Sequence, residues 1–153
     1  MWNQCKSVVL RGAFILMALA CTTLPARAAL ITLVADEETV NVGTPFDVKV
    51  LASLNPGDDL AAYFIDVIYD GLALEFETVV ISDALGSIGF DAVDVSLPPA
   101  VFGSLGIVNI AVESFLADFS SQPNELLLAT LTYTALTPGT VMLGIGDFPA
   151  LDD

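Results

Sequence analysis

Carboxylates are almost the only side chains in this sequence that could carry chemistry. All 19 Asp and Glu residues follow Ala28, whereas Cys, His, Arg and Trp do not occur beyond that position and Lys49 is the only base there. Most covalent and acid–base catalysis in proteins uses the residue types that are missing. Zinc and copper sites are disfavoured for the same reason, because their usual ligands are His and Cys.

One type of catalysis stays possible with paired carboxylates alone. It is the hydrolysis of a glycosidic bond, in which one carboxyl group acts as the acid and the other as the base or nucleophile. The candidate pairs are Asp66 with Asp70 and Glu75 with Glu77. Side chains two residues apart on a strand share a face at about 6.5–7 Å. Exposed carboxylates are common on strands, however, and nothing in the sequence indicates a pocket or a raised pKa. We therefore predict that the protein is not an enzyme.

Calcium is the one metal that the composition favours, because it takes oxygen ligands. The densest carboxylate groups are Asp36-Glu37-Glu38, Asp58-Asp59 and Asp152-Asp153, and none has the spacing of an EF-hand loop. We expect no cofactor other than a structural calcium ion. Its candidate ligands are Asp36 and Asp152, provided that the two ends of the domain meet.

The first 28 residues have the pattern of an export signal. Lys6 and Arg11 are basic, Ala13–Ala20 is a short apolar run, and Ala26-Arg27-Ala28 offers small residues around a cleavage site. The run is shorter than the ~20 residues that cross a bilayer, and no later stretch reaches that length without a charge, Gly or Pro. We predict a signal peptide at residues 1–28, no membrane span in the mature chain, and a location that is secreted, extracellular or at the cell surface.

Removal of the signal leaves residues 29–153, which is 153 − 28 = 125 residues and enough for one domain. Both cysteines, Cys5 and Cys21, are lost with the signal, so no disulfide can stabilise that domain. Its formal charge is 1 − 19 = −18, which repels nucleic acids and anionic lipids and attracts cations. Nucleic acid is thus excluded as a partner.

Apolar and polar residues alternate with period two, and Gly, Pro and Asn turns separate the runs at intervals typical of β-sandwiches. The alternation is clean in Phe46–Val50. In Ala61–Tyr69 one face is predicted to hold Tyr63, Ile65, Val67 and Tyr69. On its other face Phe64 and Ile68 flank Asp66, which predicts a central strand partly covered on both sides.

The segments after Tyr69 are also interpreted from the alternation of apolar and polar residues and from the turns between them. Leu72–Ile81 is expected to form two strands or one bent strand, residues 82–103 a long loop with or without a short strand, and Ile107–Glu113 another strand. Glu125–Leu136 is a strong strand with Leu127, Ala129, Leu131, Tyr133 and Ala135 on its inner face and Thr130, Thr132 and Thr134 on its outer face. A Pro-Gly turn then leads into Val141–Ile145, which predicts a hairpin.

Three segments carry a resemblance to a known family. Val40–Val48 reads VNVGTPFDV, Ala62–Asp70 reads AYFIDVIYD before Leu74-Glu75-Phe76, and Leu128–Ala135 reads LATLTYTA before Pro138-Gly139-Thr140. In this order they resemble bacterial cohesin-like domains, over nearly all of residues 29–153. The order of the segments is more specific than any one of them.

The resemblance implies an all-β fold, a nine-stranded antiparallel β-sandwich of the jelly-roll kind, related to bacterial cellulose-binding modules. It also implies, for cohesins of cellulosomes, binding to dockerin modules. Similar sequences occur in exported PEP-CTERM-type proteins, which end in a Pro-Glu-Pro sorting signal, a membrane helix and an arginine cluster. That tail is not in the sequence, and the last strand expected after Ile145 is either missing or supplied otherwise.

A fold does not fix a function, and two functions stay open. The first is a secreted, non-catalytic binding or structural module in a polysaccharide-associated or matrix assembly, with a protein or extracellular polysaccharide as partner. Its candidate binding surface is the outer face of Thr130, Thr132 and Thr134. The alternative is a carbohydrate-binding module associated with polysaccharide catabolism. That function calls for exposed aromatic rings that stack on sugars, but the domain has no Trp and its three tyrosines are expected to face inward.

Overall fold

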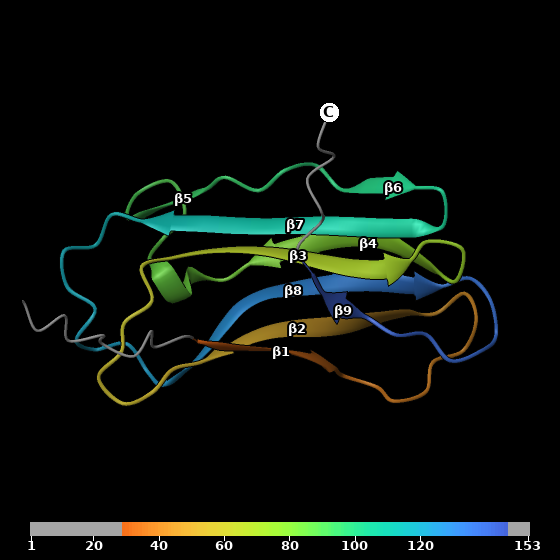
Figure 1. Ribbon diagram of the computed structural model, residues 1–153, viewed down its shortest axis with the longest axis horizontal. Coiled ribbons are helices and arrows are strands. Elements are labelled where there is room, and N and C mark those ends of the chain that lie inside the picture. Colours follow the sequence, from red (N-terminus) through yellow and green to blue (C-terminus); the bar gives the residue numbers. More distant parts are fainter. Residues whose placement is uncertain (1–28, 147–153) are drawn as a thin grey trace, which may run out of the picture.

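The computed structural model describes residues 29–146 as a sandwich of two antiparallel β-sheets (Figure 1). The predicted signal peptide and residues 147–153 of the predicted domain lie outside the described residues. The elements are β1 (Leu30–Ala35), β2 (Pro45–Ser53), β3 (Ala62–Asp70), β4 (Leu74–Ile81), the 3-10 turn η1 (Asp83–Leu85), β5 (Ala92–Asp94), β6 (Ala100–Phe102), β7 (Leu105–Ser114), β8 (Glu125–Ala135) and β9 (Gly144–Ile145). The predicted nine-stranded all-β sandwich is confirmed.

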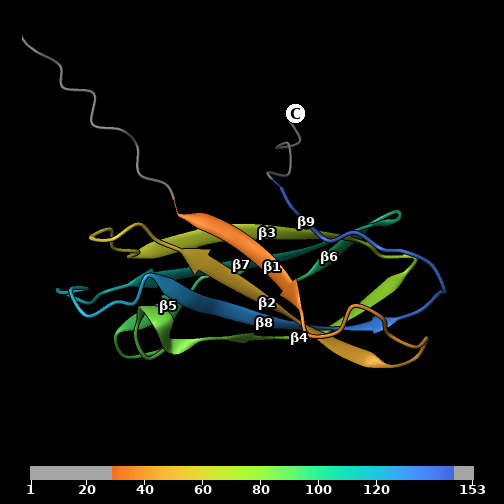
Figure 2. The same cartoon turned by 90° about the horizontal axis from the view of Figure 1, so that it is seen from below.

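The two sheets are built from strands that are distant in sequence. One sheet has the order β1-β2-β8-β4, and the other has the order β5-β7-β3-β9 with β6 also paired to β7. Figure 2 shows the two layers from below, with β1 and β9 on the near side. Both sheets therefore present an edge strand on that side, β1 from one and β9 from the other.

The space between the sheets is filled by apolar side chains, because inward residues alternate with outward ones along each strand. The inner face predicted for β3 is confirmed, and the same alternation buries Val48 and Val50 of β2 and Val108, Ile110 and Val112 of β7. No polar or charged residue among those described is buried. The largest fully buried side chains are Tyr133, Leu85, Ile110, Leu128, Leu131, Val48, Val50, Val67, Val108 and Val112. Stability thus rests on apolar burial.

A cluster of aromatic rings joins the two sheets. Tyr133 of β8 lies 5.1 Å from Tyr69 of β3, 5.7 Å from Phe76 of β4 and 6.1 Å from Phe46 of β2, measured between ring centroids. The Tyr69 ring occupies the space that a Cβ on Gly106 of β7 would need. Rings at these separations and tilts attract one another beyond the area that they bury.

The three tyrosines are core residues, as predicted. Tyr63 donates a hydrogen bond from its hydroxyl to the carbonyl oxygen of Leu128 at 3.0 Å. The Tyr133 hydroxyl is buried and has no hydrogen-bond partner. Burial raises the pKa of both Tyr63 and Tyr133, with smaller contributions from Asp94 at Tyr63 and from Tyr69 at Tyr133. None of these rings is available to stack on a sugar.

The predicted inner face of β8 is wrong at one residue. Leu127 is 39% exposed, whereas Leu128 and Ala129 are both buried. The cause is a β-bulge: Val50 of β2 pairs with Ala129 and Leu51 pairs with Leu127, so that Leu128 is an extra residue in β8. A bulge shifts the alternation by one residue, and the sequence pattern of period two does not reveal it.

Two connections also differ from the expectation. The segment after the Pro-Gly turn forms β9, which pairs with β3 in the opposite sheet and not with β8, so the predicted hairpin is wrong. The region from 82 to 103 contains η1 and two short strands, β5 and β6, which both pair with β7. The Leu72–Ile81 segment forms one strand, β4, with an irregularity between Phe76 and Thr78.

The outer side of β3 is only partly covered. Ile68 is half-buried, and it lies beside Gly144 and Gly146. Phe64 is 65% exposed, and within residues 29–146 β9 pairs only with Val67 and Ile68 of β3. The prediction of a central strand that is partly covered on both sides is confirmed, because β3 lies between β7 and β9, and Phe64 belongs to the part of its outer side that stays open.

Replacing Tyr63 by Phe and replacing Tyr133 by Phe are predicted to have opposite effects on the free energy of unfolding. Tyr63→Phe removes a hydrogen bond in the core and is expected to lower the free energy of unfolding by about 1 kcal/mol. Tyr133→Phe removes a buried hydroxyl without a partner and is expected to leave that free energy unchanged or raise it by up to about 1 kcal/mol. Urea denaturation of both variants measures the difference. Equal destabilisation by the two substitutions would contradict it.

Candidate functional site

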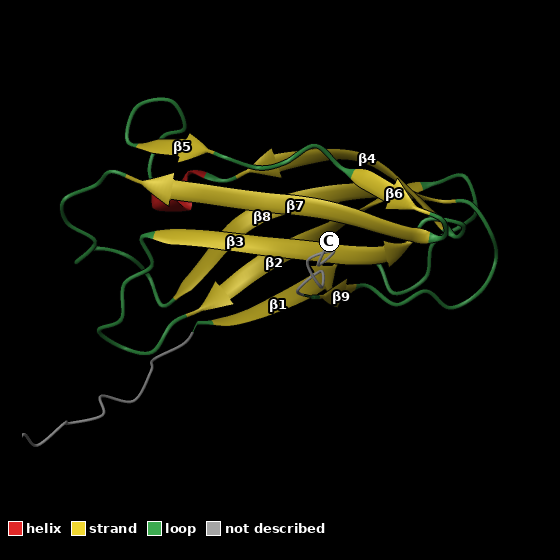
Figure 3. Cartoon of the chain, turned by 45° about the horizontal axis from the view of Figure 1, so that its top comes forward, coloured by secondary structure: helices red, strands yellow, loops and turns green. Residues whose placement is uncertain are grey.

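The outward side of the second sheet is the first candidate surface, named here the β3–β7 face. It consists of Phe64, Asp66 and Ile68 from β3 and Ile107, Asn109 and Ala111 from β7, which pair directly across the two strands. Figure 3 shows β3 and β7 side by side, with β5 and β6 beyond β7. The alternation that buries Tyr63 and Ile65 places these residues on the opposite side of the sheet.

A polar pair occupies the centre of the β3–β7 face. Asn109 donates a hydrogen bond from Nδ2 to Oδ1 of Asp66 at 2.8 Å, and its Oδ1 accepts one from the backbone N–H of Leu97 at 2.9 Å. Both side chains are half-buried. Asn109 therefore fixes the Asp66 carboxylate and ties the segment after β5 to the sheet.

The segment after β5 is attached to β7 by further bonds. The N–H of Val95 donates to the carbonyl of Ala111 at 2.9 Å, and the N–H of Ala111 donates to Oγ of Ser96 at 2.9 Å. These bonds continue the β7 edge where regular pairing stops. The segment covers part of the β3–β7 face and leaves the rest open.

Apolar side chains surround the polar pair. Phe64 and Leu97 are each about two-thirds exposed, and Ile145 of β9 is exposed to a smaller extent. Phe64, Asp66, Asn109 and Ile145 line a surface hollow. A mainly apolar surface with a few fixed polar groups at its centre is the composition typical of protein-binding surfaces.

The three threonines named from the sequence lie where they were predicted, on the outer face of β8 between β2 and β4. Thr130, Thr132 and Thr134 are all half-buried. The hydroxyl of Thr132 donates to Oδ1 of Asp47 at 2.7 Å, which leaves it less free to bind a partner. A binding role for this face stays a prediction.

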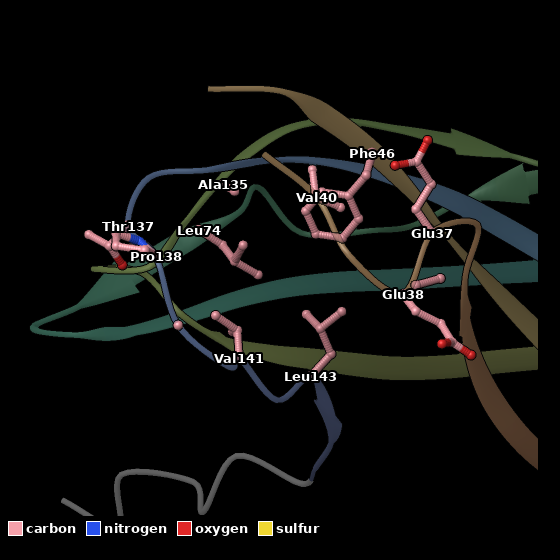
Figure 4. Close-up of a pocket in the computed structure, with 12 residues that line it drawn as sticks. Glu37, Glu38, Val40, Phe46, Leu74, Ala135, Thr137, Pro138, Val141 and Leu143 are labelled. Atoms are coloured by element: carbon pink, nitrogen blue, oxygen red, sulfur yellow. The ribbon is translucent and has the colours of Figure 1, made fainter. Parts of the chain in front are cut away.

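A cavity of about 260 Å³ lies between the end of β1 and the segment from 137 to 143. Figure 4 shows the aliphatic side chains of Val141 and Leu143 on one side of it and Phe46 on the other, with Glu37 and Glu38 at one end. Most of the residues that line it are apolar, and Glu37 and Glu38 are the charged ones. The sequence pattern does not reveal this cavity, because its lining comes from four separate segments.

The calcium candidates are not brought together by the described residues. Asp36 is exposed and accepts a hydrogen bond on Oδ1 from the backbone N–H of Asp47 at 3.0 Å. Asp152 lies outside the described residues. Between residues 29 and 146 there is no group of three or more acidic, His or Cys side chains that could hold a metal ion. The Asp36–Asp152 site stays a prediction.

Two of the four candidate catalytic carboxylates, Asp66 and Asp70, serve local structure. Asp66 is bonded to Asn109, and Oδ1 of Asp70 accepts a hydrogen bond from the N–H of Leu72 at 2.9 Å, which closes a turn. Glu75 and Glu77 are exposed on β4, where the irregularity after Phe76 interrupts the alternation between them. Neither pair lines a shared pocket among those found in the described part of the chain.

The sequence does not single out the β3–β7 face, because Phe64 and Ile68 on either side of Asp66 predict a central strand that is partly covered. The available signal was the aromatic residue Phe64 at an outward position in an alternating strand. Whether such a residue is covered depends on segments that are distant in the sequence, such as residues 95–97, and local patterns do not determine their path. In addition, no helix within residues 29–146 has the length and apolar character needed to cross a bilayer.

Comparison with solved structures identifies the fold as cohesin-like. A type II cohesin domain from the cellulosome of Acetivibrio cellulolyticus superposes with a TM-score of 0.63 and 16% identity, covering 81% of this chain and 78% of that chain. Type II cohesin A11 from Bacteroides cellulosolvens gives a TM-score of 0.61 and 15% identity, covering 80% of each chain. A type II cohesin–X–dockerin complex from Acetivibrio cellulolyticus gives 0.55 and 16%, covering 81% of each chain. No protein-family model matches the sequence, and no curated protein matches it significantly.

The Asp66–Asn109 bond predicts a pH-dependent defect in the variant Asn109→Asp. A second carboxyl beside Asp66 raises the pKa of the pair, because both cannot ionise at such a distance without repulsion. The folded variant then binds more protons than its unfolded form below that raised pKa, so its stability increases as the pH falls from 7 towards 5. We expect a loss of about 1–3 kcal/mol at pH 7 that shrinks at pH 5, measured by urea denaturation.

Asn124→Asp provides the matched control for Asn109→Asp, since Asn124 is exposed in the loop before β8 and the substitution adds the same charge. Its stability is expected to follow that of the unmodified chain at both pH values. If the two variants behave alike, the bond between Asn109 and Asp66 does not contribute as described.

The calcium hypothesis predicts that added Ca²⁺ raises the thermal midpoint of the exported chain and that chelator lowers it again, because an ion bound only by the folded state stabilises it. Asp36→Asn should reduce the rise, and Asp59→Asn, which changes an exposed carboxylate elsewhere, should not. An unchanged midpoint in Ca²⁺ would remove the Asp36–Asp152 site from consideration.

Proposed function

We propose that this chain is a non-catalytic protein-binding module of an exported protein and that its partner docks on the β3–β7 face. The observation that carries the proposal is the arrangement of exposed Phe64 and Leu97 around the fixed Asp66–Asn109 pair. The fold supports it, because one of the compared structures is a cohesin in a complex with an X–dockerin partner. At 16% identity this support concerns the fold, and the face itself is argued from its residues.

The chemistry of the β3–β7 face favours a protein partner over a substrate. Exposed Phe64 and Leu97 offer apolar area that a protein surface can bury, while the Asp66 carboxylate retains acceptor capacity for a donor from the partner. A substrate would require a deep site with titratable groups placed for reaction. The β3–β7 face has only a surface hollow.

The charge of the domain specifies the partner further. The 19 carboxylates against a single lysine after residue 28 create a negative field around any docking surface. A partner with basic residues around an apolar centre is attracted by that field, and its association rate falls as salt is added. Acidic partners are repelled.

An extracellular location completes the proposal. Residues 1–28 provide the export pattern, and their removal leaves a domain whose stability needs no disulfide, as described above. Direct sequencing of the N-terminus of the secreted chain tests this point, with Ala29 as the expected first residue. The polysaccharide-associated assembly suggested by the cohesin resemblance belongs to the same proposal.

The threonine face of β8 remains a second docking surface. Val80 of β4, which is 62% exposed and pairs with Thr130, is its most exposed apolar residue near the threonines. We rank it below the β3–β7 face because its hydroxyls are partly engaged within the sheet, as with Thr132 and Asp47. The two faces lie on opposite sides of the sandwich, so variants can separate them.

The proposed function predicts a face-specific loss of binding. Phe64→Asp is expected to weaken the affinity for the protein partner at least about tenfold, because it removes central apolar area and adds repulsion near Asp66. Partners are first captured from the growth medium of the source cells with the immobilised chain and identified by mass spectrometry. Their dissociation constants are then measured with purified components.

Val80→Asp is the matched control, since it replaces an equally exposed apolar strand residue with the same charged residue on the other face. It should leave the affinity within about twofold. If Val80→Asp or a triple Ala variant of Thr130, Thr132 and Thr134 weakens binding more than Phe64→Asp does, the partner docks on the threonine face. If no protein binds with measurable affinity, the function as a protein-binding module is wrong.

A carbohydrate-binding module is the alternative that one observation favours. Phe90 and Phe115 are 88% and 68% exposed, and a hydrogen bond of 2.7 Å from the N–H of Phe115 to the carbonyl of Asp91 holds their two loops together. Planar rings such as those of Phe90 and Phe115 can stack on a sugar while a neighbouring carboxylate, such as that of Asp91, binds a hydroxyl group of the sugar. A glycan array separates the alternatives: binding that is lost in Phe90→Ala favours the carbohydrate function.

A further inference from the structure

A second hollow lies on the side of the sandwich away from β1 and β9, between β4 of one sheet and β6 of the other (Figure 3). Its volume is about 420 Å³, and we call it the β4–β6 hollow. Tyr69 of β3 lines it from within the core. The apolar residues around it are Leu74 and Phe76 from β4, Pro99 and Val101 from the segment around β6, and Leu136 after β8.

The hydroxyl of Tyr69 is directed into this hollow. Tyr69, Gly106 and Val101 pair directly across β3, β7 and β6, so they form one row. The far end of the Tyr69 ring occupies the space that a Cβ on Gly106 would need, which means that the side chain crosses β7 along this row. Its hydroxyl therefore extends past Gly106 on the side of Val101, and the absence of a Cβ at Gly106 is what permits this path.

The Tyr69 hydroxyl has no hydrogen-bond partner among residues 29–146, although Tyr69 is only 4% exposed. Tyr63, on the same face of β3, does have one, the carbonyl oxygen of Leu128. Burial raises the pKa of Tyr69, so its hydroxyl stays protonated at neutral pH and can donate. A nearly buried donor without an acceptor costs free energy. An acceptor atom placed in the hollow would remove that cost.

The shape of the hollow favours a flat ligand. Its apolar walls come from both sheets, with Leu74 and Phe76 on one side and Pro99 and Val101 on the other. A planar ring fits between two such walls, and aromatic rings attract one another beyond the area that they bury. A cavity of about 150 Å³ already holds a benzene ring, so one ring with a short substituent fits here.

The charges around the hollow disfavour anions. Glu75 is the charged residue that lines it. Lys49 is the only base within residues 29–146, and it lies on the outward side of β2. An anionic ligand would therefore meet repulsion without a compensating cation.

We propose that the β4–β6 hollow binds a small, uncharged aromatic compound that carries a carbonyl oxygen. The ring of the compound packs between Phe76 and Val101, and its oxygen accepts a hydrogen bond from the Tyr69 hydroxyl. Apolar contact provides most of the affinity and the single polar group fixes the orientation, as is usual in small-molecule sites. The site is separate from the β3–β7 face and does not depend on the proposed function.

Acetophenone and ethylbenzene test the proposal, because they are similar in size and differ in the carbonyl oxygen. Each is titrated into the purified full chain, and amide chemical shifts in NMR spectra report both the site and the dissociation constant. Acetophenone is expected to shift the amides of Gly71 and Val101 in a saturable way. It should bind about three- to tenfold more tightly than ethylbenzene, the effect of one hydrogen bond. Benzoate should not bind.

Tyr69→Phe removes the donor without breaking a hydrogen bond of the protein, so the fold should stay intact. Its affinity for acetophenone should fall to that for ethylbenzene, while its affinity for ethylbenzene stays unchanged. Tyr133→Phe is the matched control, because it removes the hydroxyl of the adjacent ring, which is buried and does not line the hollow. Both affinities should be unchanged in that variant.

A second pair of variants locates the site. Val101→Asp places a charge on an apolar wall and should weaken the binding of both compounds at least about fivefold. Val80→Asp makes the same change at a similarly exposed strand valine outside the hollow, and it should have no effect. Phe64→Asp should also have no effect here, so a failure of this proposal and a failure of the proposed function are distinguishable.

Several outcomes would overturn the proposal. They include no saturable binding of acetophenone, equal affinities of the unmodified chain for acetophenone and ethylbenzene, and an equal loss of both in Tyr69→Phe. Shifts confined to Phe46 and Val141 would place the compound in the cavity at the end of β1 instead. Tighter binding of 1-phenylethylamine, a cation of nearly the same shape, would show that Glu75 and not Tyr69 selects the ligand.

Discussion

Apolar packing between the two sheets is the interaction on which the rest of this structure depends. Residues 29–146 contain no cysteine, and none of their polar or charged side chains is buried, so neither disulfides nor internal ion pairs hold the layers together. The rings of Tyr133, Tyr69 and Phe76 join strands of both sheets at one end of this interior. Because the three tyrosines are used in the core, recognition is left to the outer faces, the loops and the sheet edges.

The fold could be predicted from the sequence to the extent that burial imposes a pattern. A strand with one buried face must alternate, and Tyr63–Tyr69 and Val108–Val112 therefore reveal their inner faces directly. The prediction was wrong where pairing between distant strands changes the local rule. The extra residue Leu128 in β8 is set by its register against β2, and the choice of β3 as the neighbour of β9 depends on how the chain crosses between sheets.

The candidate sites are likewise of two kinds, those that follow from local alternation and those that depend on segments distant in the sequence. The outward threonines of β8 follow from the alternation alone, and the structure places them as expected. The β3–β7 face does not, because its exposure depends on the path of the segment tied down by Asn109. A single sequence records that Phe64 is outward, but it does not record whether the loop that contains Leu97 crosses above it; here Leu97 approaches Asn109, and Phe64 stays exposed.

The acidic charge connects these features. An uncharged edge such as β1 is ordinarily a risk, because identical copies can pair along it and aggregate. In this chain the strand itself carries no protection, but the 19 carboxylates of the molecule repel other copies at long range. A backbone edge bonds to any extended chain, so its selectivity must come from elsewhere. Electrostatic repulsion provides it, and Glu37 and Glu38 at the end of β1 add to the repulsion of other acidic chains. The charge that excludes nucleic acids thereby also limits which strands can pair with β1.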